Sequence, residues 1–185
     1  MRKGRYIETM DEIKARDSKG CRITLFDIDS NIVEAWRKEF NGVEDVQVLH
    51  TPFEEIESEY VVTAGNSFGW MTGGIDLAVR NYYGVEVQDA IQQQIIFYYR
   101  GEMPVGKALV VKTRDEKKPN LIYMPTMRYP GKIDPIDVFY VFYKLLDNFK
   151  EKEIACCGLG TLTGGIAAED CAKAMRKAYR EIYGE

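Results

Sequence analysis

The sequence predicts a three-layer α/β/α domain in which a mixed, mostly parallel β-sheet carries helices on both faces. Short apolar runs alternate along the chain with longer segments whose apolar residues repeat at helical spacing. Two of the apolar runs end in glycine-rich turns that lead into a helical segment, as in strand-to-helix connections. Strands separated by helices pair in parallel, and 185 residues are enough to bury a sizeable core.

The first half of the chain is expected to contain three strands and three helices. Each strand is predicted from a short apolar run, and the three lie at 22–27, 46–50 and 60–64. Apolar residues at helical spacing predict the helices, at 32–40, 75–82 and 87–98. The third helix is expected to end at Gly101, before Pro104, since neither residue continues a helix well.

The second half repeats the pattern, with strands predicted at 107–112, 120–124 and 153–158. Asp134 as N-cap and Pro135 in the first helical position predict a helix that runs to about Phe149. A closing helix has one apolar face, made by Cys171, Ala172, Met175, Ala178, Tyr179 and Ile182. No internal repeat or linker interrupts the chain, so we expect one domain over residues 1–185, with 22–50 as an N-terminal strand–helix–strand unit.

Composition restricts the classes of function. The net charge is −4 and no block of lysine and arginine occurs, which argues against a nucleic-acid partner but not against a small anionic ligand. No secretion signal and no run of 18 apolar residues occurs, so we expect a cytoplasmic protein without a membrane partner. The cysteines (21, 156, 157 and 171) lack metal-ligand spacing and are predicted to be reduced thiols. The sequence predicts no metal site and no cofactor, and His50 receives no catalytic role.

Two glycine-rich loops, 64–76 and 158–165, are the candidate ligand-binding elements. Each follows an apolar run and precedes a helical segment. Glycine lets the backbone approach a ligand closely, and a helix start presents unpaired N–H groups and the positive end of a dipole. Two such loops on one sheet edge could hold a diphosphate between them. The alternative is that both are simply tight turns, since short motifs have a high false-positive rate.

The order of motifs resembles that of macrodomains, a family that binds ADP-ribose. The segment VVTAGNSFGWMTGGIDLAVRNYYG is similar to the family signature, and Asn66 and Asp76 have the ten-residue spacing of the signature's second Asn and its Asp. Three later segments, MPVGKALVVKT, LIYMPTM and GTLTGGIAAEDCAKA, resemble further family motifs in the same order. The similarity covers about residues 46–183.

The resemblance implies a role for each matching residue. Asn66 would bond to the distal ribose, and Asp76 would position or activate a water there, so these two are the candidate catalytic residues. The diphosphate would bind to backbone N–H groups of Gly73, Gly74, Ile75, Thr161, Leu162, Thr163, Gly164 and Gly165, and Gly65 and Gly160 are further candidate ligand-binding residues. The alternative for Asp76 is an ordinary first-turn acid stabilised by the helix dipole.

The sequence also departs from the family pattern. Thr63 replaces the first asparagine of the signature, and Met71 and Thr72 replace two glycines. Leu162 and Gly164 replace a glycine and an aromatic residue of the second loop. The missing ring could be supplied from the other loop, by Phe68 or Trp70, or those rings could simply pack the loop onto the core.

The adenosine end of the ligand needs a different anchor, because the family's adenine-binding aspartate falls near Pro52. Asp27 and Asp29 end the first strand, where an acid can accept from ribose or adenine, and both are candidate binding residues. The alternative is that Asp29 or Ser30 caps the next helix, with Ser30 favoured. Arg128 could pair with a phosphate or be a solvated surface charge.

Two kinds of function follow from the resemblance. The first is hydrolysis of an ADP-ribose conjugate, such as an ADP-ribosylated protein, O-acetyl-ADP-ribose or ADP-ribose-1''-phosphate. The second is a non-catalytic module that binds ADP-ribose or another NAD-derived metabolite. A nicotinamide-dependent oxidoreductase is disfavoured, because residues 27–31 contain none of the glycines that its phosphate-binding turn requires.

Overall fold

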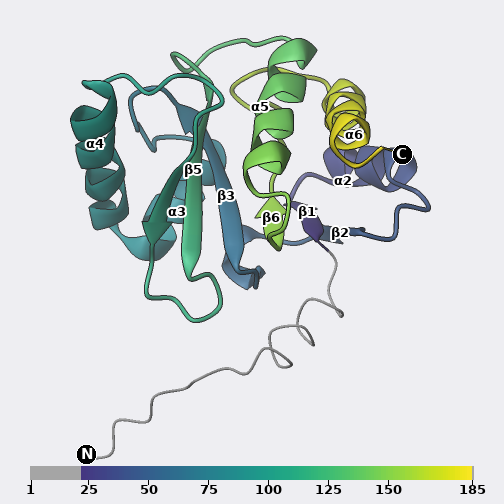
Figure 1. Cartoon of the computed structure of the whole chain (residues 1–185), viewed down its shortest axis with the longest axis horizontal. Helices are drawn as coiled ribbons and strands as arrows, with labels where there is room; N and C mark the ends of the chain where they lie inside the picture. Colours follow the sequence, from purple (N-terminus) through teal and green to yellow (C-terminus); the bar gives the residue numbers. More distant parts are fainter. Residues whose placement is uncertain (1–21, 185) are drawn as a thin grey trace, which may run out of the picture.

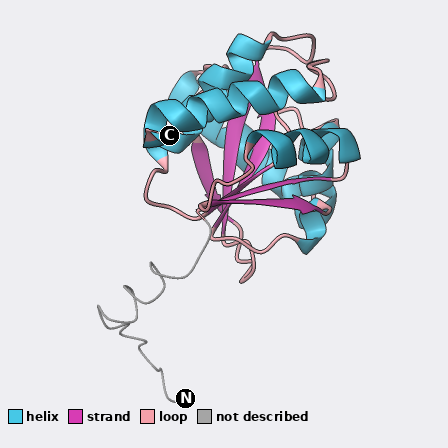
Figure 2. Cartoon of the chain, turned by 90° about the vertical axis from the view of Figure 1, so that its right-hand side faces the viewer, coloured by secondary structure: helices cyan, strands magenta, loops and turns pink. Residues whose placement is uncertain are grey.

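The computed structural model describes residues 22–184, which form a six-stranded sheet between two layers of helices (Figures 1 and 2). The strands are β1 (Ile23–Asp27), β2 (Val46–His50), β3 (Tyr60–Asn66), β4 (Leu109–Lys112), β5 (Asn120–Met127) and β6 (Ile154–Cys156). The helices are α2 (Ser30–Glu39), α3 (Gly74–Tyr83), α4 (Val85–Tyr99), α5 (Pro135–Asn148) and α6 (Ala168–Tyr183), with a 3-10 turn, η1, at Phe53–Glu55. The predicted fold class is confirmed.

The strand order is β2-β1-β6-β3-β5-β4, and only β4 runs antiparallel to its neighbour. The last strand in sequence, β6, therefore lies between β1 and β3. This order brings the carboxyl ends of β1, β6, β3 and β5 together at one edge of the sheet. Loops that lie far apart in the sequence meet there, which is where ligands bind in open α/β sheets.

Alternate strand residues divide the core into two clusters, one on each face of the sheet. On one face, Leu25, Val62 and Cys156 pack with α2, α5 and α6. On the other, Phe26 and Val61 pack with α3, α4 and η1. The two helix layers are seen on opposite sides of the sheet in Figure 1.

Most predicted boundaries agree with the structure to within two or three residues, and the exceptions have local causes. β5 continues to Met127 through Pro125, although proline lacks a backbone donor. The antiparallel pairing with β4 ends at Tyr123, so this donor is not needed on that side. β6 ends at Cys156 rather than at 158, because the Gly158 N–H turns to the Asp27 carboxylate (3.1 Å).

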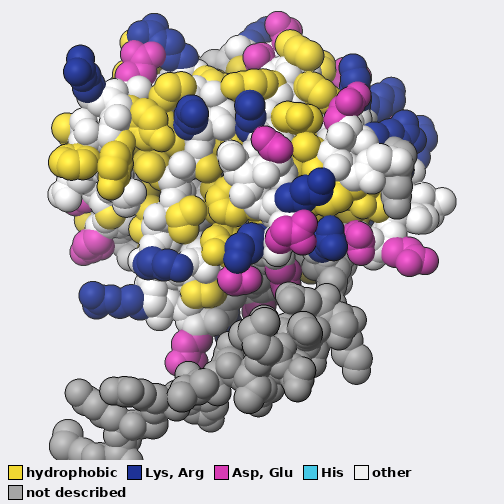
Figure 3. Space-filling view, in the orientation of Figure 1, with side chains coloured by type: hydrophobic (Ala, Val, Ile, Leu, Met, Phe, Trp, Pro, Cys, Tyr) yellow, Lys and Arg dark blue, Asp and Glu magenta, His cyan; other side chains and the backbone are white. Residues whose placement is uncertain are grey.

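α4 has an apolar side that the core does not use. Val87, Ile91 and Ile95 face the sheet, whereas the neighbouring Phe97 is 79% exposed. Hydrophobic side chains are visible over this end of the molecule in Figure 3. None of the helices within residues 22–184 has the length and apolar character needed to cross a membrane.

Candidate functional site

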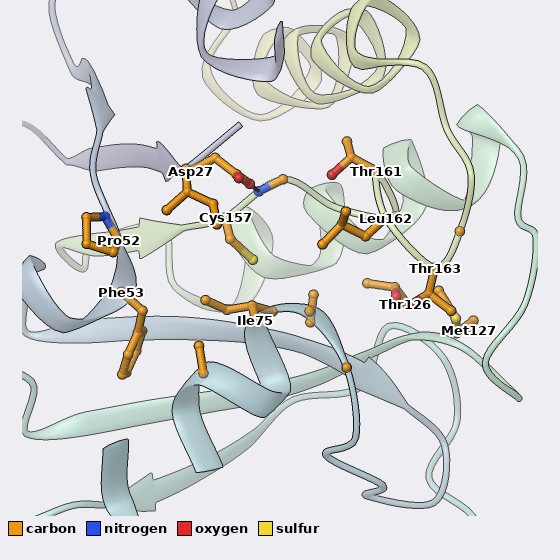
Figure 4. A pocket seen from close by; sticks show the side chains of 18 of the residues that line it. Asp27, Pro52, Phe53, Ile75, Thr126, Met127, Cys157, Thr161, Leu162 and Thr163 are labelled. Carbon is orange, nitrogen blue, oxygen red and sulfur yellow. Dashed lines mark hydrogen bonds between the residues drawn. The ribbon is translucent and has the colours of Figure 1, made fainter. Parts of the chain in front are cut away.

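A cleft of about 280 Å³ opens at the carboxyl edge of the parallel strands. Its lining comes from the ends of β1, β3, β5 and β6, from η1 and from both glycine-rich loops. Asp27, Pro52 and Phe53 lie at one end, and Thr126, Met127 and Thr163 at the other (Figure 4). The lining is more apolar than polar, as in most small-molecule sites.

The second glycine loop presents a row of free backbone donors to the cleft. Its turn is closed by bonds from the Ile166 N–H to the Gly160 carbonyl (3.0 Å) and from the Gly165 N–H to the Leu162 carbonyl (3.1 Å). Within residues 22–184, these bonds leave the N–H groups of 161–164 without a protein partner. Successive free N–H groups in a turn form an anion-binding concavity.

The first glycine loop supplies a second set of donors on the opposite wall. α3 begins after Gly73 and has no side-chain cap, so the N–H groups of its first turn stay available among the described residues. The two walls are close: a Cβ built on Gly74 would lie 3.6 Å from Cδ1 of Leu162. A diphosphate has two phosphoryl groups that each accept hydrogen bonds. It fits between two facing sets of N–H groups, one of which is a helix N-terminus.

Asp27 joins the first strand to the second glycine loop. Its carboxylate accepts the N–H of Gly158 (3.1 Å) and the N–H of Asp29 (3.0 Å), and it lines the cleft. A Cβ on Gly158 would come within 2.9 Å of both Asp27 Oδ2 and Thr161 Oγ1, so the close approach requires glycine here. Asp27 therefore has a structural contact in addition to its exposure to the cleft.

Asp29 and Arg128 do not line the cleft. Asp29 is the N-cap of α2 and accepts the Asn31 N–H (2.9 Å), so the favoured Ser30 cap was wrong. Arg128 is exposed and pairs with Glu102 (2.6 Å), outside the cleft lining. Its guanidinium also lies over the Tyr129 ring.

Asn66 organises the first glycine loop instead of facing the cleft. Its side-chain carbonyl accepts the N–H groups of Phe68 (3.1 Å) and Trp70 (3.3 Å). Its amide donates to the Trp70 carbonyl (2.8 Å), and the residue is buried. Among the described residues, every side-chain atom that could bind a ribose thus already has a backbone partner.

Asp76 is buried in the first turn of α3 and does not line the cleft. Its carboxyl group accepts a hydrogen bond from the Thr63 hydroxyl of β3. Burial raises the pKa of Asp76 to about 8, and the Thr63 hydrogen bond opposes this shift only in part. The residue that replaces the signature's first asparagine is therefore the direct partner of the candidate catalytic acid.

Of the remaining predicted residues, most line the cleft and two do not. Those in the cleft are Gly73, Gly74, Ile75, Gly160, Thr161, Leu162, Thr163 and Gly164. Gly65 lies over Tyr123, where an added Cβ would come within 2.3 Å of the ring hydroxyl, and Gly165 is in a left-handed conformation beside the cleft wall. Phe68 stacks with Trp70 and with Tyr129, outside the lining.

Sequence reasoning missed several wall residues: Ile28, Phe53, Glu54, Ala78, Thr126, Met127 and Cys157. The position of β6 between β1 and β3 brings Cys157 to the middle of the cleft lining (Figure 4), and Gly158 follows it in the chain and also lines the cleft. Burial raises the pKa of the Cys157 thiol, so this sulfur behaves as an apolar group. Cys156, Cys157 and Cys171 are free thiols, as predicted, and Cys21 lies outside the described residues.

Tyr123 supports the first glycine loop from below, and its hydroxyl should contribute measurably to stability. This hydroxyl donates to the Asn66 carbonyl (2.7 Å) and accepts the Asn66 N–H (3.1 Å) in the buried interior. Tyr123→Phe removes a buried partner from the Asn66 N–H and leaves the Asn66 carbonyl with only the Gly69 N–H (3.4 Å), so we expect it to lower the free energy of unfolding by roughly 1–3 kcal/mol. Urea unfolding measures this, with the exposed Tyr129→Phe as the matched control; equal stability of the two variants would contradict it.

Known proteins support the same fold. The model of the Macro domain family matches residues 62–175. A protein of Aquifex aeolicus (strain VF5), described as uncharacterized, is 25% identical over 143 residues, which cover 75% of this chain and 82% of that protein.

Two solved structures superpose on the chain. The macrodomain of Mycobacterium tuberculosis DarG has a TM-score of 0.59 at 24% identity, covering 69% of this chain and 84% of that one. Thermosipho africanus DarTG in complex with ADP-ribose has a TM-score of 0.56 at 16% identity, covering 86% of this chain and 51% of that one. The family model extends over more than half of the sequence and includes both glycine-rich loops. The chain therefore belongs to the Macro domain family.

Proposed function

We propose that the cleft binds ADP-ribose or an ADP-ribose derivative, with the diphosphate between the two glycine loops. The observation that carries this proposal is the pair of facing backbone N–H sets, one at residues 161–164 and one at the uncapped start of α3. Such donors bind phosphate without a basic side chain, which fits a chain with a net charge of −4. The ADP-ribose held by the Thermosipho DarTG structure, which shares this fold, supports the same ligand.

The two ends of the cleft suit the two ends of such a ligand. The end with Ile28, Pro52 and Phe53 combines apolar side chains with two acidic residues, Asp27 and Glu54, which suits a planar base with amine donors. The opposite end, at Thr126, Met127 and Thr163, would then receive the distal ribose. Asp27 and Asp29 remain candidates for the adenosine end, although Asp29 lies outside the lining.

Hydrolysis of an ADP-ribose conjugate is the second candidate function, and the raised pKa of Asp76 favours it. A carboxyl group with a pKa of about 8 can exchange a proton near neutral pH, as a general acid or base must. The burial of Asp76 against Thr63, and the use of Asn66 by the loop backbone, favour binding without turnover. Binding is therefore our first proposal.

Calorimetry with ADP-ribose, together with turnover assays, separates the two functions. We expect the protein to bind ADP-ribose and to bind ribose 5-phosphate at least tenfold more weakly, because the fragment loses the base end of the cleft. The turnover substrates are ADP-ribosylated protein, O-acetyl-ADP-ribose and ADP-ribose-1''-phosphate. No heat of binding with ADP-ribose would overturn the proposal. Turnover that disappears in Asp76→Asn, while affinity is kept, would establish hydrolysis instead.

A further inference from the structure

Lys118 is a charged residue whose side chain is almost wholly buried, with 1% of it exposed. It lies in the loop between β4 and β5, away from the cleft lining. Burying an ammonium group is costly unless it is paired and hydrogen-bonded. The contacts that compensate Lys118 therefore indicate what this side chain holds in place.

The ammonium group joins the β4–β5 loop to η1. Its Nζ donates to the carbonyl oxygens of Glu54 (3.2 Å) and Ile56 (3.0 Å). The Asp115 carboxylate lies 3.8 Å away and supplies the counter-charge. Both carbonyls belong to η1 or to the residue that ends it, where a cation is favoured by the dipole of the turn.

Two aromatic rings complete the enclosure of Lys118. Its Nζ lies 4.5 Å from the ring centre of Tyr82, on α3, and 5.4 Å from that of Phe53. The Tyr82 hydroxyl donates to Asp115 (3.0 Å), and the Tyr82 and Phe53 rings meet edge to face. Lys118 thus ties together η1, the β4–β5 loop and the C-terminal part of α3, whose N-terminus forms the phosphate wall.

The segment that Lys118 contacts, η1 with the preceding Pro52, forms one wall of the cleft. Pro52, Phe53 and Glu54 line the end that also contains Asp27 (Figure 4). η1 is a single turn, and a short turn of this kind has little stability of its own. Its position must therefore come from tertiary contacts, which include the two Lys118 hydrogen bonds.

We infer that Lys118 is a positioning residue that fixes the Pro52–Glu54 wall and thereby sets affinity for the base of the ligand. The inference rests on the proposed function for the identity of the ligand, but not for the position of the wall. If Lys118 only filled space, methionine, an unbranched side chain of similar length, would replace it without changing the cleft. If Lys118 positions the wall, the same change alters the cleft.

The test compares Lys118→Met with Lys117→Met. Lys117 is the adjacent lysine, but its side chain is 62% exposed and pairs with Glu57 at the surface. We expect Lys118→Met to weaken ADP-ribose binding about tenfold and to leave ribose 5-phosphate affinity within about twofold, because only the base end is disturbed. Lys117→Met should change neither affinity. Equal losses for both ligands, or no loss for either, would overturn the inference.

Hydrogen exchange of the ligand-free proteins provides a readout that needs no ligand. Amides of residues 53–57 should exchange at least tenfold faster in Lys118→Met, with the sheet amides unchanged. If Lys118→Met does not fold, Asp115→Asn removes the counter-charge with little change of shape and should shift the same amides in the same direction. Faster exchange at 53–57 without any ADP-ribose binding would support the role of Lys118 and contradict the proposed function. Unchanged exchange at 53–57 would contradict the role of Lys118.

Discussion

Replacing Gly164 by alanine is expected to weaken ADP-ribose binding at least a hundredfold. A Cβ at this position would lie 2.5 Å from the Gly160 carbonyl oxygen and 2.8 Å from its Cα, and both are backbone atoms that cannot turn away. It would also lie 2.9 Å from Cγ1 of Ile133. The loop must change its path, so the N–H groups of 161–164 no longer converge on the diphosphate.

The stability cost of Gly164→Ala is expected to be smaller than its effect on binding. Overpacking of this kind costs about 1–3 kcal/mol, and the fold should survive it. Gly131→Ala is the matched control, because its Cβ would approach no atom closer than 3.9 Å and the residue does not line the cleft. Calorimetry and urea unfolding measure the two effects. Wild-type affinity in Gly164→Ala would contradict the assignment of this loop to the diphosphate.

Gly73→Ala tests contact with the ligand without changing the shape of the loop. An alanine here would meet no protein atom within 4 Å, and the backbone is extended, so Gly73→Ala should keep wild-type stability. Its Cβ would still project at the cleft wall. A loss of affinity at unchanged stability would therefore come from contact with the ligand itself.

Asp76→Asn is expected to make the protein more stable than the wild type at high pH. Burial raises the pKa of Asp76 from its ordinary value of 3.8 to about 8 in the folded state, with Thr63 as the hydrogen-bond donor. A group whose pKa is raised on folding contributes full stability below its unfolded pKa and loses it as the pH rises through the folded pKa. The wild type should therefore lose stability between about pH 4 and pH 8.

Asparagine has a similar shape and can accept the same Thr63 hydrogen bond, but it does not ionise. The difference in free energy of unfolding between Asp76→Asn and wild type should thus move in favour of the variant by about 4 kcal/mol from pH 5 to pH 9. Urea unfolding across this range measures the difference. The charge of Asp76 also contributes to raising the pKa of two other groups, Tyr123 on β5 and Cys157 after β6. Both groups remain in the variant.

Glu153→Gln serves as the control for Asp76→Asn. It also removes a carboxyl group whose pKa is raised, by partial desolvation and by the nearby Glu59 charge, but Glu153 is an exposed residue. It should show a much smaller change with pH. A stability difference between Asp76→Asn and wild type that stays constant over the whole range would contradict the buried, protonated state of Asp76.

The sequence by itself determined the layered fold and the two glycine-rich loops. Periodicity is a local property, so each strand and helix could be recognised from its own residues. Glycines that follow a strand and precede a helix mark a turn with free N–H groups, and eight of the predicted loop residues line the cleft. The resemblance of the segments around Asn66 and Asp76 to macrodomains was confirmed by the family match.

Only the tertiary structure decided what the polar side chains contact. Asn66 bonds to its own loop, Asp76 is buried against Thr63, and Asp27 holds Gly158, which lies 131 residues away in the sequence. These contacts depend on β6 lying between β1 and β3, an order that periodicity does not contain. The same holds for Lys118, whose partners Glu54 and Ile56 are 64 and 62 residues distant. Local patterns specify elements, whereas the burial and partners of a polar group depend on which distant segments the sheet brings together.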